Sequence, residues 1–136
     1  RLEENHPNVI DGHKKPLHTI IPGLLTDKDN NATFSYGVMG GQYQPVGQAH
    51  VLQNIYDFNM NVQEAIDFPR AFINNGKLKL EKNISIKTFN FLKKAGHDVS
   101  YIQNSIGGGQ GILINRSKGI LVGGSDSRKD GLVIGY

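Results

Sequence analysis

The sequence has 136 residues, a length typical of one domain, and its 38% hydrophobic content is enough to build a core. Lysine and arginine exceed aspartate and glutamate by 15 − 12 = 3, and these basic residues are scattered without interleaved aromatics, which argues against nucleic-acid binding. The chain has no cysteine, which excludes disulfides and thiolate chemistry, and no apolar run long enough to span a membrane.

The first elements that the pattern predicts are an extended segment and a β-hairpin. Residues 1–16 are polar and contain several histidines and prolines, and they are expected to form an extended segment that leads to the first strand. Pro22 argues against a continuous strand before it, so the first strand is predicted over 23–26. A turn cluster over 27–31 and a strand over 32–38 complete the hairpin.

This second strand leads into two adjacent glycines, Gly40 and Gly41, and a broadly apolar helix is predicted over 46–58. Two successive backbone N–H groups in such a turn can point at one negative oxygen and hold it. The alternative is a tight strand-to-helix turn that needs positive φ, and the glycines taken alone favour that structural role. Other segments of the sequence are needed to distinguish an anion-binding role from a structural one.

Two further helices have clear end signals. Asn61 and Glu64 have the spacing of a capping box, and Pro69 stops the short helix that they start. Ser85 caps a third helix, in which apolar residues recur at a spacing of three, and Gly96 ends it.

The remaining strands are short. They are predicted over residues 72–73 and 78–80, around a turn at residues 74–76, over 99–102, and over 111–115 and 119–122, which form a second hairpin. Residues 107–109 are interpreted as a flexible turn and residues 123–131 as a loop. The chain is therefore predicted to be α+β, with helices segregated from mostly antiparallel strands.

Three patterns that resemble functional motifs are interpreted as structural. The glycine run over 107–111 leads into a strand rather than a helix, which excludes a P-loop. The five histidines show no ligand spacing, so no metal site is predicted. Asp67 with Arg70, and Asp126 with Arg128, are predicted to be structural ion pairs that pin loops.

Several of these segments, in this order, resemble the gamma-glutamyltranspeptidase family. Residues 15–22, Lys-Pro-Leu-His-Thr-Ile-Ile-Pro, stand where the family has Arg-Pro-Leu-Ser-Ser-Met-Ser-Pro, and Gly40 and Gly41 match its paired glycines. The other segments that resemble family motifs are 57–61, 64–65, 67–70, 96–99, 107–110, 125–128 and 135–136. The resemblance covers nearly the whole chain, and its specificity lies in the order of the motifs.

The resemblance implies a four-layer αββα sandwich of the N-terminal-nucleophile hydrolase type, made as a precursor that cleaves itself into a large and a small subunit. Residues 1–136 would be a single domain fragment, the C-terminal part of the small subunit. The family's nucleophile is a threonine at the new N-terminus, with its own α-amino group as general base. Arg1 cannot fill that role, so the nucleophile is expected upstream. Gly40 and Gly41 would supply the oxyanion hole, and the resemblance implies no metal and no cofactor.

His18 and Thr19 stand where the family has two serines that hold the γ-glutamyl α-carboxylate. This departure resembles the acylase-like branch, similar to cephalosporin and glutaryl acylases, and it leaves a hydroxyl at Thr19 for a carboxylate contact. The resemblance implies gamma-glutamyltransferase-like or hydrolase-like amide acyl transfer. The alternatives are a glutaryl-type acylase and a catalytically silent scaffold.

The expected partners are the remainder of the precursor, which comprises the large subunit and the N-terminal part of the small subunit, and a small γ-glutamyl or acyl amide. Neither nucleic acid nor a membrane is expected as a partner. A dimer of heterodimers is among the assemblies that fit the resemblance.

Overall fold

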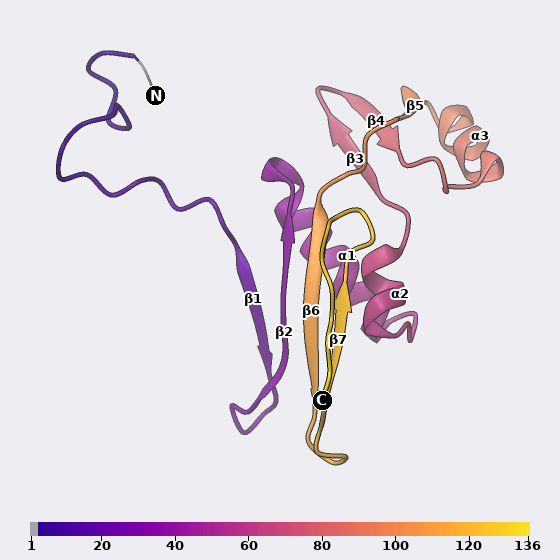
Figure 1. The fold of residues 1–136 in the computed structure, drawn as a ribbon. Helices are drawn as coiled ribbons and strands as arrows, with labels where there is room; N and C mark the ends of the chain where they lie inside the picture. The colour runs from indigo at the N-terminus through magenta and orange to yellow at the C-terminus, as the bar shows by residue number, and fades with distance from the viewer. Residues whose placement is uncertain (1–2) are drawn as a thin grey trace.

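The computed structural model describes residues 3–136, which contain seven strands, three α-helices and one 3-10 helix (Figure 1). The strands are β1 (Pro22–Thr26), β2 (Ala32–Met39), β3 (Ala71–Asn74), β4 (Lys77–Leu80), β5 (Val99–Tyr101), β6 (Gly108–Asn115) and β7 (Ile120–Ser125). The helices are η1 (Gly41–Tyr43), α1 (Gln44–Tyr56), α2 (Val62–Asp67) and α3 (Ile86–Lys94). The predicted α+β class is confirmed.

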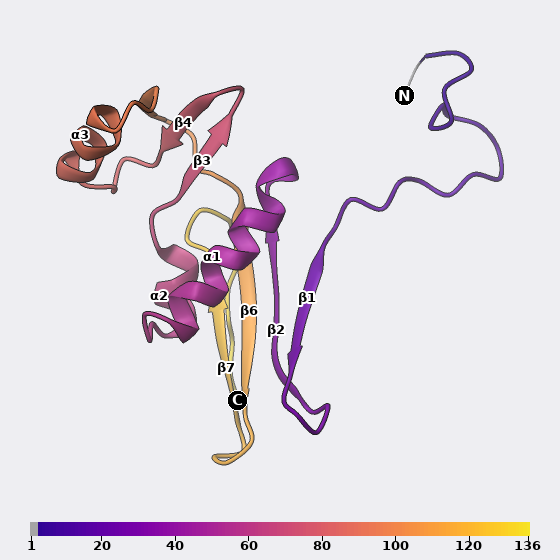
Figure 2. The same cartoon turned by 180° about the vertical axis from the view of Figure 1, so that it is seen from behind.

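The larger sheet has the order β1-β2-β6-β7, and each neighbouring pair is antiparallel. The predicted hairpin is confirmed as β1 and β2, and β6 with β7 forms the second predicted hairpin. Helices α1 and α2 both cover one face of this sheet, as the view from behind shows (Figure 2). Helix α1 begins at Gln44, two residues before the predicted start, because Pro45 fits the first turn of a helix.

The core lies between this sheet face and the two helices. Phe34, Tyr36 and Val38 alternate along β2, point to the same face and are buried. The Phe34 and Tyr36 rings stack with centroids 4.8 Å apart. Val51 of α1 and Ile66 of α2 close the core from the helical side. The apolar alternation in β2 therefore fixes which sheet face the helices cover.

The smaller sheet, β3-β4-β5, contains the sharp turn that the sequence predicted between its first two strands. Asn75 and Gly76 both have positive φ, 51° and 75°, which is the requirement of a type I′ hairpin turn. Beyond this sheet lies α3 (Figure 1), whose predicted ends are confirmed. The Ser85 side chain accepts from the Thr88 N–H, and Gly96 follows the helix with φ of 94°.

Two glycine-rich stretches differ from the prediction. Only Gly107 of the predicted flexible turn has positive φ, whereas Gly108 and Gly109 belong to β6 and pair with β2. Residues 123–125, predicted as loop, end β7. Glycine is needed here for close packing, because a Cβ on Gly124 would lie 2.8 Å from a Val62 methyl carbon of α2. Gly109 and Gly124 therefore lie where α2 approaches the sheet closely, and they do not break the strands.

The opposite face of the larger sheet remains largely apolar and exposed. Leu24 and Ile112 align across the strands on this face, with exposed fractions of 63% and 47%. The C-terminal tail approaches this face, where Val133 lies close to Gly123 of β7. The larger sheet and the helices α1 and α2 on its other face form two packed layers, and the smaller sheet lies beside them. None of the helices in the described part of the chain is long and apolar enough to cross a membrane.

Candidate functional site

The two predicted catalytic glycines lie between the end of β2 and the start of α1. Gly40 has φ of 138° and Gly41 has φ of 58°, so the turn does require positive φ at both positions. A Cβ on Gly40 would lie 3.1 Å from the Cα of Gly107, whereas a Cβ on Gly41 would have no neighbour within 4 Å. The turn is packed tightly on one side and open at Gly41.

The N–H groups of Gly40 and Gly41 are available for a ligand. Outside the regular elements of residues 3–136, the Gly40 carbonyl accepts from the Tyr43 N–H at 3.1 Å, but neither glycine N–H acts as a donor. The N–H groups at a helix start have no acceptor within the helix, and the helix dipole favours negative charge there. The oxyanion role of Gly40 and Gly41 stays a prediction, with which the positive φ angles and the N–H groups without an acceptor are compatible.

The predicted substrate-binding residues, His18 and Thr19, lie in the exposed extended segment before β1. Gln44, at the start of α1, links this segment to the glycine turn. Its side-chain Nε2 donates to the carbonyl oxygen of Thr19 at 2.8 Å and to that of Gly41 at 3.2 Å. The structure thus brings together the backbone of both predicted parts of the site. Sequence reasoning missed Gln44, although its place three residues after Gly41 was a usable signal.

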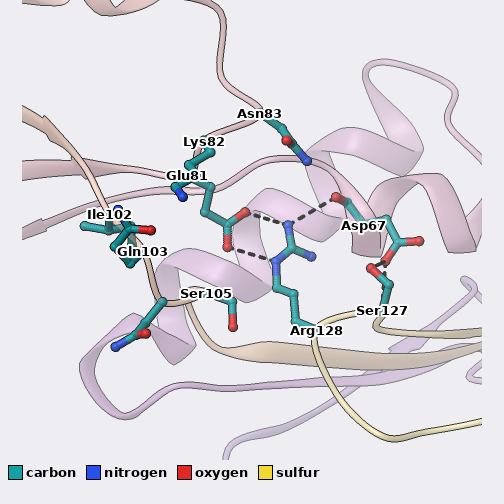
Figure 3. A pocket seen from close by; sticks show the side chains of 10 residues that line it. Asp67, Glu81, Lys82, Asn83, Ile102, Gln103, Ser105, Ser127 and Arg128 are labelled. Atoms are coloured by element: carbon teal, nitrogen blue, oxygen red, sulfur yellow. Dashed lines mark hydrogen bonds and ion pairs between the residues drawn. The ribbon is translucent and has the colours of Figure 1, made fainter.

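A buried ion-pair network lies beneath the turn. Arg70 pairs with Asp126 at 2.6 Å, and Arg128 pairs with Glu81 at 2.6 Å and with Asp126 at 3.1 Å. Figure 3 shows the Arg128 guanidinium facing the Glu81 carboxylate. The predicted pair of Asp126 with Arg128 is confirmed, but Asp67 does not pair with Arg70 as predicted. It accepts instead from the hydroxyl and the N–H of Ser127, at 2.8 and 3.0 Å.

Glu81 is the network member that sequence reasoning missed. Burial alone would raise the pKa of its carboxyl, but hydrogen bonds from Arg128 and from the N–H groups of Ile106 and Arg70 lower that pKa below its usual range. The carboxylate therefore stays charged near neutral pH. Glu81 follows β4 with no motif around it, so nothing local in the sequence connects it to either arginine.

The network holds the chain segment against which the glycine turn packs. Arg70 donates from Nη1 to the Ile106 carbonyl at 2.7 Å, and the Ile106 N–H donates to Glu81 at 2.9 Å. The Gly109 N–H donates to Asp126 at 2.6 Å. Residues 106–109 are thereby fixed, and Gly107 within them is the close neighbour of Gly40.

Two cavities border these elements. One, of about 430 Å³, reaches Gly40 and is lined by residues of the turn, the smaller sheet and the 102–107 segment. The other, of about 210 Å³, lies beside Arg128 and Glu81 (Figure 3). Among residues 3–136 no group of three histidine, aspartate or glutamate side chains could hold a metal ion.

Comparisons with known proteins show which proteins this chain is similar to. The family model described as gamma-glutamyltranspeptidase matches residues 1–136. The chain is 32% identical to the glutathione hydrolase-like YwrD proenzyme of Bacillus subtilis, over 98% of this chain and 27% of that protein. It is 29% identical to the oxamate amidohydrolase proenzyme of Klebsiella pneumoniae, over 99% of this chain and 27% of that protein. The chain thus spans about a quarter of the length of these relatives.

Among solved structures, the cephalosporin acylase from Bacillus halodurans superposes with a TM-score of 0.81 and 36% sequence identity. The match covers 99% of this chain and 26% of the acylase chain. The gamma-glutamyltranspeptidases and acylases share the fold of the N-terminal-nucleophile hydrolases, and this chain forms a part of that fold.

Proposed function

Because the chain belongs to the gamma-glutamyltranspeptidase family, we propose that it is the C-terminal part of the small subunit of an enzyme that transfers or hydrolyses the acyl group of an amide. The nucleophile is a threonine upstream of this chain, freed at a new N-terminus by cleavage of the precursor. The observation that carries the proposal is the pair of N–H groups of Gly40 and Gly41, which lack an acceptor in the turn.

In this proposal the threonine hydroxyl attacks the carbonyl carbon of the amide, and its proton passes to the threonine α-amino group. The carbonyl oxygen becomes an oxyanion, which the N–H groups of Gly40 and Gly41 stabilise. The C–N bond then breaks, the α-amino group gives its proton to the leaving amine, and the acyl group stays on the threonine. Water or a second amine releases it and regenerates the hydroxyl.

The partners in the proposal are the large subunit and the N-terminal part of the small subunit. Support comes from the apolar sheet face that carries Leu24 and Ile112, which are exposed in this chain. A sheet packs with a hydrophobic face against another layer. The second sheet of the sandwich is the layer that this face requires.

A second candidate function is that of an acylase for glutaryl-like amides. The specific observation is His18-Thr19 at the place of the two carboxylate-binding serines. The 36% identity to a cephalosporin acylase supports the same candidate. A silent scaffold would not need two open N–H donors at the turn, which favours an enzyme.

The specificity test compares γ-glutamyl and glutaryl p-nitroanilides with the complete polypeptide. The parent should turn over the γ-glutamyl anilide slowly, because an imidazole replaces one hydroxyl that would hold the α-carboxylate. The combined change His18→Ser and Thr19→Ser should raise kcat/KM for the γ-glutamyl anilide by roughly tenfold to a hundredfold, the effect of one hydrogen bond to a charged group.

Three other results would change the proposal. A parent that cleaves neither anilide argues for the scaffold. A parent that strongly prefers the glutaryl anilide, and keeps that preference in the serine variant, supports the acylase candidate. A parent that prefers the γ-glutamyl anilide and loses this preference in the serine variant would show that His18 itself binds the carboxylate.

A further inference from the structure

The Gln44 side chain makes three hydrogen bonds, which join the two parts of the proposed site. Besides its two donor bonds, to the carbonyls of Thr19 and Gly41, its Oε1 accepts from the Ile21 N–H at 3.2 Å. A primary amide has two N–H donors and one carbonyl acceptor. Both donors and the acceptor are therefore in use.

The contacts with the extended segment imitate a strand partner. In a parallel pair, one residue bonds to the carbonyl before and to the N–H after the residue opposite it. Gln44 reaches the Thr19 carbonyl and the Ile21 N–H in this way, around Ile20. Gln48, one helical turn further along α1, donates to the Ile21 carbonyl. Two glutamines of one helix face thus hold the segment.

Apolar packing contributes little to the position of this segment. Leu17 and Ile20 have exposed fractions of 72% and 68%. Burial of such side chains would normally supply the free energy that fixes a loop. Within the described chain, the hydrogen bonds from Gln44 and Gln48 therefore set where His18 and Thr19 lie relative to α1.

We propose that Gln44 is a positioning residue for acyl-group specificity. It fixes the spacing between the carboxylate-binding end of the acyl pocket, His18-Thr19, and the carbonyl-binding end, Gly40-Gly41. A fixed spacing favours short dicarboxylic acyl groups, whose two ends must be held at once. This inference rests on the proposed function, because it assigns the substrate class of that same site.

The experiment replaces Gln44 by methionine, which keeps the length and helix preference of the side chain but removes all three hydrogen bonds. Glutaryl and valeryl p-nitroanilides are compared with the complete polypeptide, since the two acyl groups have equal length and only glutaryl carries a carboxylate. Gln44→Met should raise KM for the glutaryl anilide roughly tenfold, the value of one to two hydrogen bonds. The valeryl anilide should change by less than about threefold.

Gln53→Met is the matched control, because Gln53 is an exposed glutamine of the same helix. It should alter neither substrate. A second readout does not depend on catalysis: amide hydrogen exchange at residues 19–21 should become faster in Gln44→Met and stay unchanged in Gln53→Met.

An active parent whose Gln44→Met variant keeps both KM values, or loses both substrates equally, overturns the role of Gln44 alone. Unchanged exchange at residues 19–21 does the same. A parent that cleaves no amide overturns the proposed function and the specificity role with it. The two failures are therefore distinguishable.

Discussion

Gly41→Val should slow acylation of the nucleophile about a hundredfold or more in the complete polypeptide, the cost of roughly 3 kcal/mol for one lost oxyanion donor. A β-branched residue is a genuine outlier at the φ of 58° that Gly41 adopts. Because the site of the new Cβ is empty within 4 Å, the effect comes from the backbone and not from a clash. The measurement is the burst of p-nitroaniline in the first turnover, with KM followed separately.

Gly119→Val provides the matched control. Gly119 also has positive φ, 64°, and a Cβ added to it would also have no neighbour within 4 Å, but it lies in the β6–β7 turn. Its valine variant should carry the same backbone strain and keep the burst rate. If Gly41→Val acylates the nucleophile at the parental rate, or if Gly119→Val slows acylation equally, the glycine pair has only the structural role of a turn.

Arg70→Leu should lower the free energy of unfolding by about 3–5 kcal/mol, the usual cost of breaking a buried ion pair. The Arg70 side chain is 2% exposed and that of Asp126 is fully buried, so the carboxylate would lose its closest cation without gaining water. The Ile106 and Ile66 carbonyls would also lose a donor. Urea unfolding of the complete polypeptide measures the change.

Arg116→Leu is the control for losing an arginine, since Arg116 is exposed and donates a long bond of 3.3 Å to the backbone carbonyl of Ala32. Its effect should stay within about 0.5 kcal/mol. A double-mutant cycle with Asp126→Leu separates the pair from its surroundings, and the double variant should be more stable than Arg70→Leu. An Arg70→Leu variant with the parental urea midpoint would show that the network does not hold the fold.

The parts of the fold that the sequence predicted are those with local causes. The capping box of Asn61 and Glu64 joins residues three apart, and the Asn75-Gly76 turn needs only its own two residues. The strand residues Gly108 and Gly124 were missed for a physical reason. Glycine has a low strand propensity, and the need for glycine at Gly124 comes from a tertiary neighbour, Val62 of α2, whose methyl carbon a Cβ would meet at 2.8 Å.

The candidate site also contains some features with local causes and others that depend on tertiary contacts. Gly40 and Gly41 could be placed in a positive-φ turn from the sequence because such a turn depends on adjacent residues, whereas their oxyanion role came from the family resemblance and stays a prediction. The residues that support the turn could not be paired in advance, because Arg70 and Asp126 are 56 residues apart and Gln44 and Thr19 are 25 apart. Such contacts depend on how the sheet and α1 are assembled, and no local pattern encodes them.

A crystal structure of the complete polypeptide with a boronic acid analogue of a glutaryl or γ-glutamyl group would test the oxyanion role most directly. Such a compound forms a tetrahedral adduct with the threonine hydroxyl and places an oxygen where the oxyanion develops. The proposed function predicts that this oxygen lies roughly 2.7–3.1 Å from the backbone nitrogens of both Gly40 and Gly41. An adduct whose oxygen is held by other donors, with both glycine N–H groups turned away, would contradict it.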